Sequence, residues 1–160
     1  AISGDSSGGN IAAAVALRSR DQNGPKLALQ VLIYPVANYG FDTASYHRNA
    51  AGYDLTRDAM IWFWTRYLPS PEYGDEPCAS PLRAKDLTGL PPALVLTAQY
   101  DPLCDDGEAY AARLHSAGVP VRVTRYLDMN HGFFNWGAVC KSADCAFQEA
   151  ADTLKEAFRR

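Results

Sequence analysis

The first residues of the chain most constrain its fold, because Gly4, Ser6 and Gly8 form a Gly-x-Ser-x-Gly pattern ahead of an alanine-rich segment. This pattern is typical of a sharp turn from a strand into a helix, which exposes the central serine beyond the end of a sheet. The turn brings backbone segments close together, and Gly4 and Gly8 suit it because neither has a Cβ atom. We therefore predict the end of a strand at residues 1–3 and a helix from the turn to about Arg20.

The start of such a helix points free N–H groups and a positive dipole end toward the Ser6 hydroxyl, which makes Ser6 the candidate nucleophile. A glycine- and serine-rich turn at an ordinary helix N-cap would give the same residues, and this alternative stays open. The motif is also close to the Gly-Asp-Ser-Gly-Gly motif of chymotrypsin-like proteases, whose serine follows the histidine and aspartate and lies among β-strands. Here Ser6 comes first and enters a helix, which disfavours that class of protease.

Composition and charge are those of an ordinary folded domain. Of the 160 residues, 48% are hydrophobic and 21% charged, so disorder is disfavoured. The net charge of −3, with no run of lysine or arginine, gives no electrostatic basis for binding nucleic acid or an anionic membrane. The apolar runs are far shorter than the ~20 residues needed to span a bilayer. The cysteines match no zinc pattern, so reduced thiols are expected, with a Cys140–Cys145 disulfide as the alternative.

Strands and helices alternate along the rest of the chain. The apolar runs at residues 27–34 and 93–98 indicate strands buried on both faces, as in a parallel sheet. The alternating pattern at residues 121–126 indicates a strand nearer the sheet edge. Helices are expected over residues 106–117, followed by Gly118 as the C′ residue, and over residues 143–158. This order predicts an α/β fold with a mostly parallel sheet and flanking helices.

Residues 36–92 form an insertion between two strands. Thr56 is placed to cap a helix over residues 57–68, whose apolar residues cover most of its circumference and predict burial on two sides. The aromatic residues of segment 38–69 are expected over or beside the mouth of the site, although they could equally pack against the sheet. The candidate substrate-pocket residues are Phe41, Trp62 and Phe134. The predicted buried face of the last helix is Phe147, Ala151, Leu154 and Phe158.

Two polar residues follow the ends of two predicted strands. Asp101 comes after the strand that ends at residue 98, and His131 after the strand that ends near residue 126. Loops at the carboxyl ends of parallel strands converge on one crevice, so we expect Asp101 and His131 to meet Ser6 there. A serine hydroxyl becomes a good nucleophile only when a base takes its proton. Histidine can serve as that base because it titrates near neutral pH, and a carboxylate orients its imidazole ring. The three residues therefore predict nucleophilic catalysis in the chain order Ser, Asp, His.

Other histidines and aspartates compete for these roles. His115 falls on a predicted helix surface, and His47 lies in the insertion. Asp105 and Asp106 are better explained as charges at a helix start. Asp5 adjoins Ser6, and neighbouring residues on such a turn cannot both face one histidine.

On these motifs the chain resembles the hormone-sensitive-lipase-like family of α/β-hydrolase esterases. The stretches that carry the resemblance are Gly-Asp-Ser-Ser-Gly-Gly-Asn at 4–10, Tyr-Pro at 34–35, Ser-Pro-Leu at 80–82, Leu-Pro-Pro-Ala at 90–93, Tyr-Asp-Pro-Leu-Cys-Asp-Asp-Gly at 100–107, Tyr-Ala-Ala-Arg-Leu at 110–114, Ala-Gly-Val-Pro-Val at 117–121 and His-Gly-Phe at 131–133. Ser7 and Cys104 depart mildly from the family pattern, which usually has alanine and a basic residue there.

The resemblance implies a hydrolase of carboxylic esters that forms an acyl-enzyme. The implied substrates are small esters with short to medium acyl chains or aryl groups, with no cofactor or metal. An amidase or deacetylase of the same family is the alternative. A second alternative is a binding protein like the gibberellin receptors, which lack the catalytic histidine, so His131 argues against it. We expect a cytoplasmic protein; no oligomeric state is predicted.

Family members carry a His-Gly-Gly-Gly oxyanion loop, a cap and the first strands ahead of the serine turn. Residues 1–160 therefore look like the C-terminal half of such a catalytic domain, with the backbone N–H of Ser7 as its one oxyanion donor. We expect this chain alone to hydrolyse esters poorly or not at all. We also expect apolar residues along the strand at 27–34 to be exposed.

Overall fold

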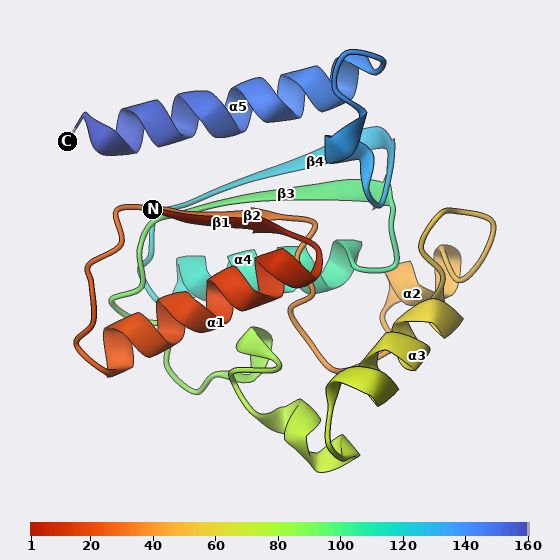
Figure 1. Ribbon diagram of the computed structural model, residues 1–160, viewed down its shortest axis with the longest axis horizontal. Helices are drawn as coiled ribbons and strands as arrows, with labels where there is room; N and C mark the ends of the chain where they lie inside the picture. Colours follow the sequence, from red (N-terminus) through yellow and green to blue (C-terminus); the bar gives the residue numbers. More distant parts are fainter. Residues whose placement is uncertain (160) are drawn as a thin grey trace.

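A computed structural model describes residues 1–159, which contain a parallel sheet of four strands in the order β1-β2-β3-β4. The strands are β1 (Ile2–Asp5), β2 (Gln30–Ile33), β3 (Ala93–Tyr100) and β4 (Val121–Asn130). Helix α5 (Lys141–Phe158) covers one face, and α1 (Ser7–Asp21) and α4 (Cys104–Ser116) cover the other (Figure 1). The predicted α/β fold, with a mostly parallel sheet and flanking helices, is confirmed.

Two apolar cores lie on opposite sides of the sheet. Along β2 and β3, alternate residues point to opposite faces: Leu32 and Val95 pack against α1 and α4, whereas Val31 and Leu94 pack under α5. All four side chains are fully buried, and each such burial contributes about 1.5–3 kcal/mol. Both faces of β2 and β3 are therefore apolar, which explains their nearly continuous apolar sequence.

The insertion between β2 and β3 builds a third apolar cluster. It contains α2 (Ala44–Arg48), α3 (Arg57–Tyr67) and the 3₁₀ turns η1 (Pro71–Asp75) and η2 (Pro81–Arg83). The cluster comprises Val36, Tyr46, Leu55, Met60, Trp64, Ala79 and Leu103. Because Leu103 follows β3, this cluster packs the insertion against the loop at the carboxyl end of the sheet. Helix α2 is absent from the sequence-based prediction.

Several predicted element boundaries differ from the structure. Strand β2 is shorter than residues 27–34, and α4 begins at Cys104, two residues earlier than expected. Strand β4 runs on to Asn130 through the segment predicted as a loop, because a register shift near Ala98 lets Tyr100 pair with Asn130. His131 therefore follows the last paired residue directly. Gly118 follows α4 with a φ of 78°, as predicted for a C′ residue.

The predicted burial of α3 on two sides is wrong. The predicted cap is confirmed, since the Thr56 side chain accepts a bond from the Ala59 N–H at 3.1 Å. However, Trp62, Phe63 and Tyr67 are 54%, 50% and 59% exposed within the described residues. Helix α3 packs on the third cluster through one face only.

The predicted buried face of α5 is wrong for Phe147 and Phe158, whereas Leu154 is half-buried and packs against the core under α5, as predicted. Phe147 and Phe158 are 62% and 67% exposed, whereas the buried positions are Ala143, Ala146, Ala150 and Thr153. Small side chains let the helix lie close to the sheet. The face with the alanines therefore packs on the sheet, and the two phenylalanines point away from it.

Strand β1 accounts for another difference. Residues 29–34 are buried, contrary to the predicted exposure along segment 27–34, because β1 pairs with β2 from Ile2↔Gln30 to Asp5↔Ile33. Exposure instead alternates along β1 itself.

All four cysteines are free thiols, so Cys140 and Cys145 form no disulfide. None of the helices in residues 1–159 combines the length and apolar character needed to cross a bilayer.

Candidate active site

The turn between β1 and α1 holds Ser6 in a strained conformation. Its φ of 53° and ψ of −119° lie outside the regions that L-residues favour. A Cβ atom at Gly4 would lie 2.2 Å from the Gly8 carbonyl oxygen, and one at Gly9 would lie 2.9 Å from the Pro35 Cβ. A Cβ at Gly8 would meet nothing closer than 3.9 Å, so the steric role predicted for Gly8 is wrong. Gly4 and Gly9 are the positions that require glycine.

The structure brings Ser6, His131 and Asp101 into one hydrogen-bonded series. His131 Nε2 lies 2.9 Å from Ser6 Oγ, and His131 Nδ1 lies 2.7 Å from Asp101 Oδ2. With Nδ1–H donating to Asp101, the lone pair on Nε2 faces the serine hydroxyl. Ser6 is the N-cap residue of α1, yet its side chain makes no capping bond and is free for this contact. The arrangement can deprotonate the Ser6 hydroxyl.

Burial keeps the acid and base of this series away from bulk water. Asp101 is fully buried and His131 is 8% exposed. Asp101 Oδ1 accepts a bond from the Leu103 N–H at 2.8 Å, so both carboxylate oxygens are held. A buried carboxylate fixed at both oxygens orients the imidazole ring.

Tyr34 supports the histidine from the side, and sequence reasoning missed it. Its ring centroid lies 4.6 Å from that of His131, and its hydroxyl donates to Asp5 Oδ2 at 3.3 Å. Burial, with the adjacent Asp5 charge, raises the pKa of Tyr34 above its usual range, so the hydroxyl stays a donor. Tyr34 also has a positive φ of 34°. The one sequence signal for Tyr34 was the Tyr-Pro motif at 34–35, which belongs to the family resemblance.

Asn10 ties the serine turn to the insertion. Its side-chain amide donates to the carbonyl oxygens of Val36 at 2.8 Å and Ala79 at 2.7 Å. The Val36 N–H in turn donates to the Ser6 carbonyl at 3.2 Å. The start of the insertion and its segment around Ala79 are thus both bonded to the N-terminal end of α1.

The two aspartates assigned to the start of α4 differ in environment. Asp105 Oδ2 accepts a bond from the Ser45 N–H at 2.7 Å. Asp106 is 1% exposed, and neither of its carboxylate oxygens has a partner among the described residues. Burial, followed by repulsion from Asp105 and Asp101, raises the pKa of Asp106 to about 8. Both residues lie in the first turn of α4, as predicted, but Asp106 favours its neutral form at pH 7 and so supplies no charge there.

The competing histidines lie outside this series. His47 is exposed and its Nε2 lies 2.7 Å from Asp42 Oδ1, while His115 is exposed on α4. Within residues 1–159, His, Cys, Asp and Glu side chains form no group of three or more that could hold a metal ion.

The predicted pocket residues are spread over three places. Phe41 packs edge-on against Tyr39 and Tyr46, Trp62 is exposed beside Phe63, and Phe134 lies 5.7 Å from Phe147 between ring centroids. The insertion does approach the histidine loop, since Asp54 Oδ2 is 3.6 Å from the position of a Cβ at Gly132. The substrate role of Phe41, Trp62 and Phe134 stays a prediction.

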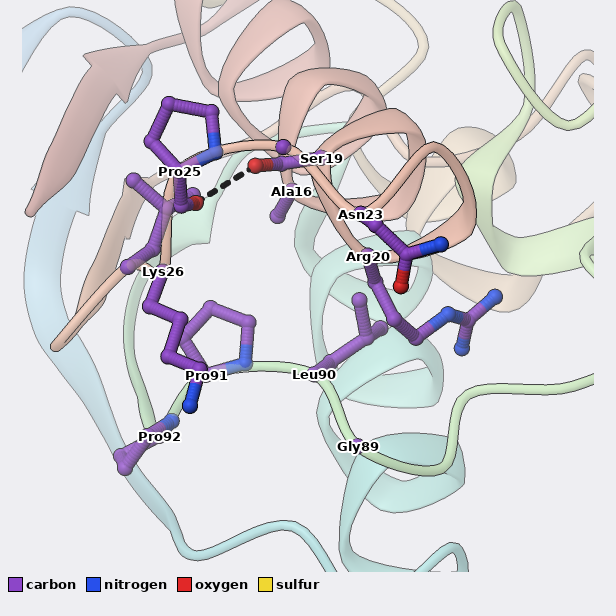
Figure 2. Close-up of a pocket in the computed structure, with 12 residues that line it drawn as sticks. Ala16, Ser19, Arg20, Asn23, Pro25, Lys26, Gly89, Leu90, Pro91 and Pro92 are labelled. Atoms are coloured by element: carbon purple, nitrogen blue, oxygen red, sulfur yellow. Dashed lines mark hydrogen bonds between the residues drawn. The ribbon is translucent and has the colours of Figure 1, made fainter.

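A hollow of about 480 Å³ lies away from Ser6, Asp101 and His131 (Figure 2). It is lined by the C-terminal part of α1 and by the segments that lead into β2 and β3, including Pro25, Lys26, Pro91 and Pro92. These segments precede the strands, whereas Ser6, Asp101 and His131 follow them. The hollow is thus at the opposite end of the sheet from the candidate site.

Comparisons with known proteins show the family of this chain. A family model for the alpha/beta hydrolase fold matches residues 1–135. The chain belongs to the α/β-hydrolase family. It is similar to a carboxylesterase of Mycobacterium tuberculosis, with 39% identity over 99% of this chain and 50% of the relative. It is also similar to an ethyl acetate hydrolase of Pseudomonas putida, with 34% identity over 98% of this chain and 49% of the relative.

Solved structures of esterases share the α/β-hydrolase fold of this chain. A fungal esterase from Rhizomucor miehei superposes with a TM-score of 0.94 and 39% identity, covering 98% of this chain and 49% of that chain. The resemblance to hormone-sensitive-lipase-like esterases is confirmed at the level of the family. The chain spans about half the length of the relatives it matches.

Proposed function

We propose that the protein is a carboxylic-ester hydrolase that works through an acyl-enzyme on Ser6. The observation that carries this proposal is the hydrogen-bonded series from Ser6 Oγ through His131 to the buried Asp101 carboxylate. The esterase names of its relatives support the same activity.

The geometry suggests the following sequence of steps. Ser6 Oγ attacks the ester carbonyl while His131 Nε2 takes its proton, and Asp101 stabilises the imidazolium that forms. His131 then gives the proton to the departing alcohol, which leaves the acyl group on Ser6. Water attacks the acyl group with His131 as its base, and the acid is released.

The negative charge on the attacked oxygen needs hydrogen-bond donors. Ser7 is the first residue of α1, and the first intrahelical bond runs from the Asn10 N–H to the Ser6 carbonyl. The Ser7 N–H therefore has no acceptor within the helix and is the proposed oxyanion donor. Residues 1–160 would then be one part of a catalytic domain, as their coverage of about half of each relative suggests.

The proposed substrates are small esters with short to medium acyl chains or aryl groups. An amidase or deacetylase would use the same three residues, so the leaving group separates the two activities. We expect the complete protein encoded by the gene to hydrolyse p-nitrophenyl butyrate at least about 10²-fold faster, as kcat/KM, than the matching butyryl p-nitroanilide, because an ester has the better leaving group. Faster cleavage of the anilide would favour the amidase. A protein that binds both compounds without turning over either would favour a ligand-binding relative.

The pocket prediction concerns Phe41, Trp62 and Phe134. Replacing each with alanine in turn should change the ratio of kcat/KM between p-nitrophenyl octanoate and p-nitrophenyl acetate by about tenfold, because apolar contacts discriminate acyl length by that order. Phe158→Ala is the control, since Phe158 is 67% exposed on α5. If the three variants lose only thermal stability and keep the wild-type ratio of kcat/KM between the two esters, these aromatic side chains contribute to packing and not to substrate selection.

A further inference from the structure

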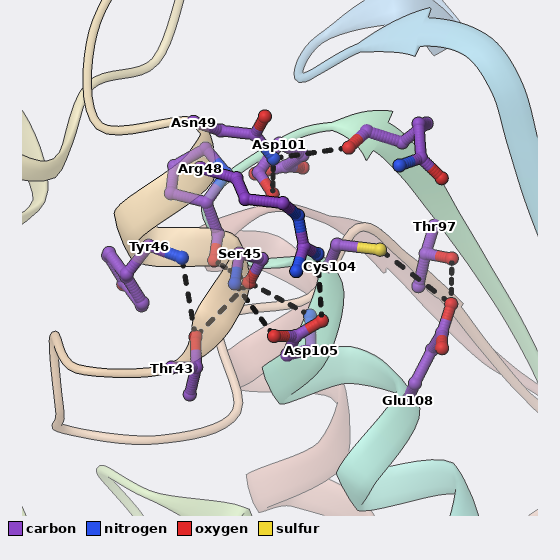
Figure 3. A network of polar contacts seen from close by, with 12 residues as sticks. Thr43, Ser45, Tyr46, Arg48, Asn49, Thr97, Asp101, Cys104, Asp105 and Glu108 are labelled. Atoms are coloured by element: carbon purple, nitrogen blue, oxygen red, sulfur yellow. Dashed lines mark hydrogen bonds and ion pairs between the residues drawn. The ribbon is translucent and has the colours of Figure 1, made fainter.

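The loop that carries Asp101 is bonded to the insertion through α2 (Figure 3). The Asn49 side-chain amide donates to the carbonyl oxygens of Gln99 at 3.1 Å and Asp101 at 3.0 Å. The Ser45 hydroxyl donates to the Pro102 carbonyl at 2.6 Å and accepts from the Asp105 N–H at 3.2 Å. These contacts join α2 and its C-cap residue Asn49 to Gln99, Asp101, Pro102 and Asp105.

The backbone of this loop needs partners that the sheet does not supply. The β3–β4 ladder shifts register between Ala98 and Tyr100, at the start of the loop. Buried carbonyl groups without a partner are costly. The Asn49 amide donates to the Gln99 carbonyl, beside the register shift, and to the Asp101 carbonyl, which also accepts a bond from the Cys104 N–H at 3.2 Å. Asn49 is 4% exposed and Ser45 is fully buried, so water has little access to replace either side chain.

We infer that Ser45 and Asn49 are positioning residues that hold Asp101 in reach of His131. This inference rests on the proposed function. The Asp101 carboxylate is itself bonded to Leu103 within the loop, so a shift of the loop carries the carboxylate with it. Its Oδ2 would then leave the 2.7 Å contact with His131 Nδ1, and the imidazole would lose its orientation.

The size of the effect follows from how steeply catalysis depends on placement. A displacement of about 1 Å can cost ~10²-fold in rate. Losing the correct histidine tautomer altogether costs about 10⁴-fold in serine proteases. The loss of rate from a loosened loop should be smaller than this ~10⁴-fold loss. Asn49→Leu is therefore expected to lower kcat by roughly 10- to 100-fold while KM changes less than about threefold.

The test compares variants of the complete protein encoded by the gene. Asn49→Leu removes both donors at similar volume, and Ser45→Ala removes the hydroxyl. Gln30→Leu is the matched control, because Gln30 is a fully buried amide that donates to the Pro91 carbonyl at 3.0 Å, at the other end of the sheet. Ser45→Thr retains a hydroxyl donor and should recover most of the kcat lost in Ser45→Ala.

Two readouts separate positioning from folding. We expect Asn49→Leu and Ser45→Ala to lower kcat and to weaken or shift the downfield proton NMR signal of the His131 Nδ1–H, whereas Gln30→Leu lowers thermal stability alone. If Asn49→Leu does not fold, Ser45→Ala and Ser45→Thr carry the comparison.

Wild-type kcat and an unchanged His131 signal in Ser45→Ala would overturn the inference, and so would an equal loss of kcat in Gln30→Leu. A Ser6→Ala variant in the same set distinguishes the two proposals. If Ser6→Ala is inactive but Asn49→Leu keeps full kcat, only the positioning role fails. If Ser6→Ala keeps wild-type turnover, the proposed function fails.

Discussion

Replacing Ser6 or His131 with alanine is expected to lower ester turnover by about 10⁴-fold or more while leaving the fold intact. Ser6 Oγ and His131 Nε2 lie 2.9 Å apart, so removing either one leaves no pair in which a base can activate the hydroxyl. The Ser6 substitution removes no capping bond, because the Ser6 side chain caps nothing in α1. The measurement is kcat/KM for p-nitrophenyl butyrate with the complete protein, together with circular dichroism to check the fold.

The chain offers matched controls for both substitutions. His115 and Ser116 are exposed neighbours at the end of α4, so His115→Ala and Ser116→Ala should keep wild-type turnover. A folded Ser6→Ala variant with turnover near that of the wild type would end the proposed mechanism. A loss of turnover in His115→Ala equal to that in His131→Ala would show that the effect is not specific to His131.

The second large effect concerns residues 1–160 on their own. We expect this segment to hydrolyse esters poorly or not at all, although Ser6, His131 and Asp101 are already in series. The Ser7 N–H is its one proposed oxyanion donor, and each donor lost from such a site costs about 10²–10³-fold in rate. Within residues 1–159, β1 pairs with β2 and its other edge is unpaired. An open edge favours association between copies over a rigid site.

This expectation is tested by expressing residues 1–160 and assaying a p-nitrophenyl ester, with Ser6→Ala as the blank. Size-exclusion chromatography of the same material reports association. Soluble, monomeric protein with Ser6-dependent turnover close to that of the complete protein would contradict the expectation. It would mean that this segment contains every group that the reaction needs.

The sequence predicted those parts of the structure that depend on local patterns. The Gly-x-Ser-x-Gly turn, the apolar strands β2 and β3, and the Thr56 cap each follow from a few neighbouring residues. Placing Asp101 and His131 beside Ser6 required one further rule, that loops at the carboxyl ends of parallel strands converge.

Features that depend on contacts between distant segments could not be predicted in this way. The inward face of α5 was missed because close packing on the sheet selects its alanines over Phe147 and Phe158. The end of β4 was missed because Asp128 and Asn130 continue the strand despite their polar side chains. The bonds from Asn49 to the Asp101 loop join residues about 50 positions apart in sequence, and no periodicity signals them.

The central claim is that Ser6 is a nucleophile activated by His131, and covalent labelling tests it most directly. A fluorophosphonate probe forms a bond between phosphorus and the serine oxygen as fluoride leaves, and the adduct is located by mass spectrometry after trypsin digestion. We predict one adduct, on Ser6 in the peptide that ends at Arg18, absent in Ser6→Ala and formed far more slowly in His131→Ala. An adduct on another residue in place of Ser6, or an unchanged labelling rate in His131→Ala, would contradict the claim.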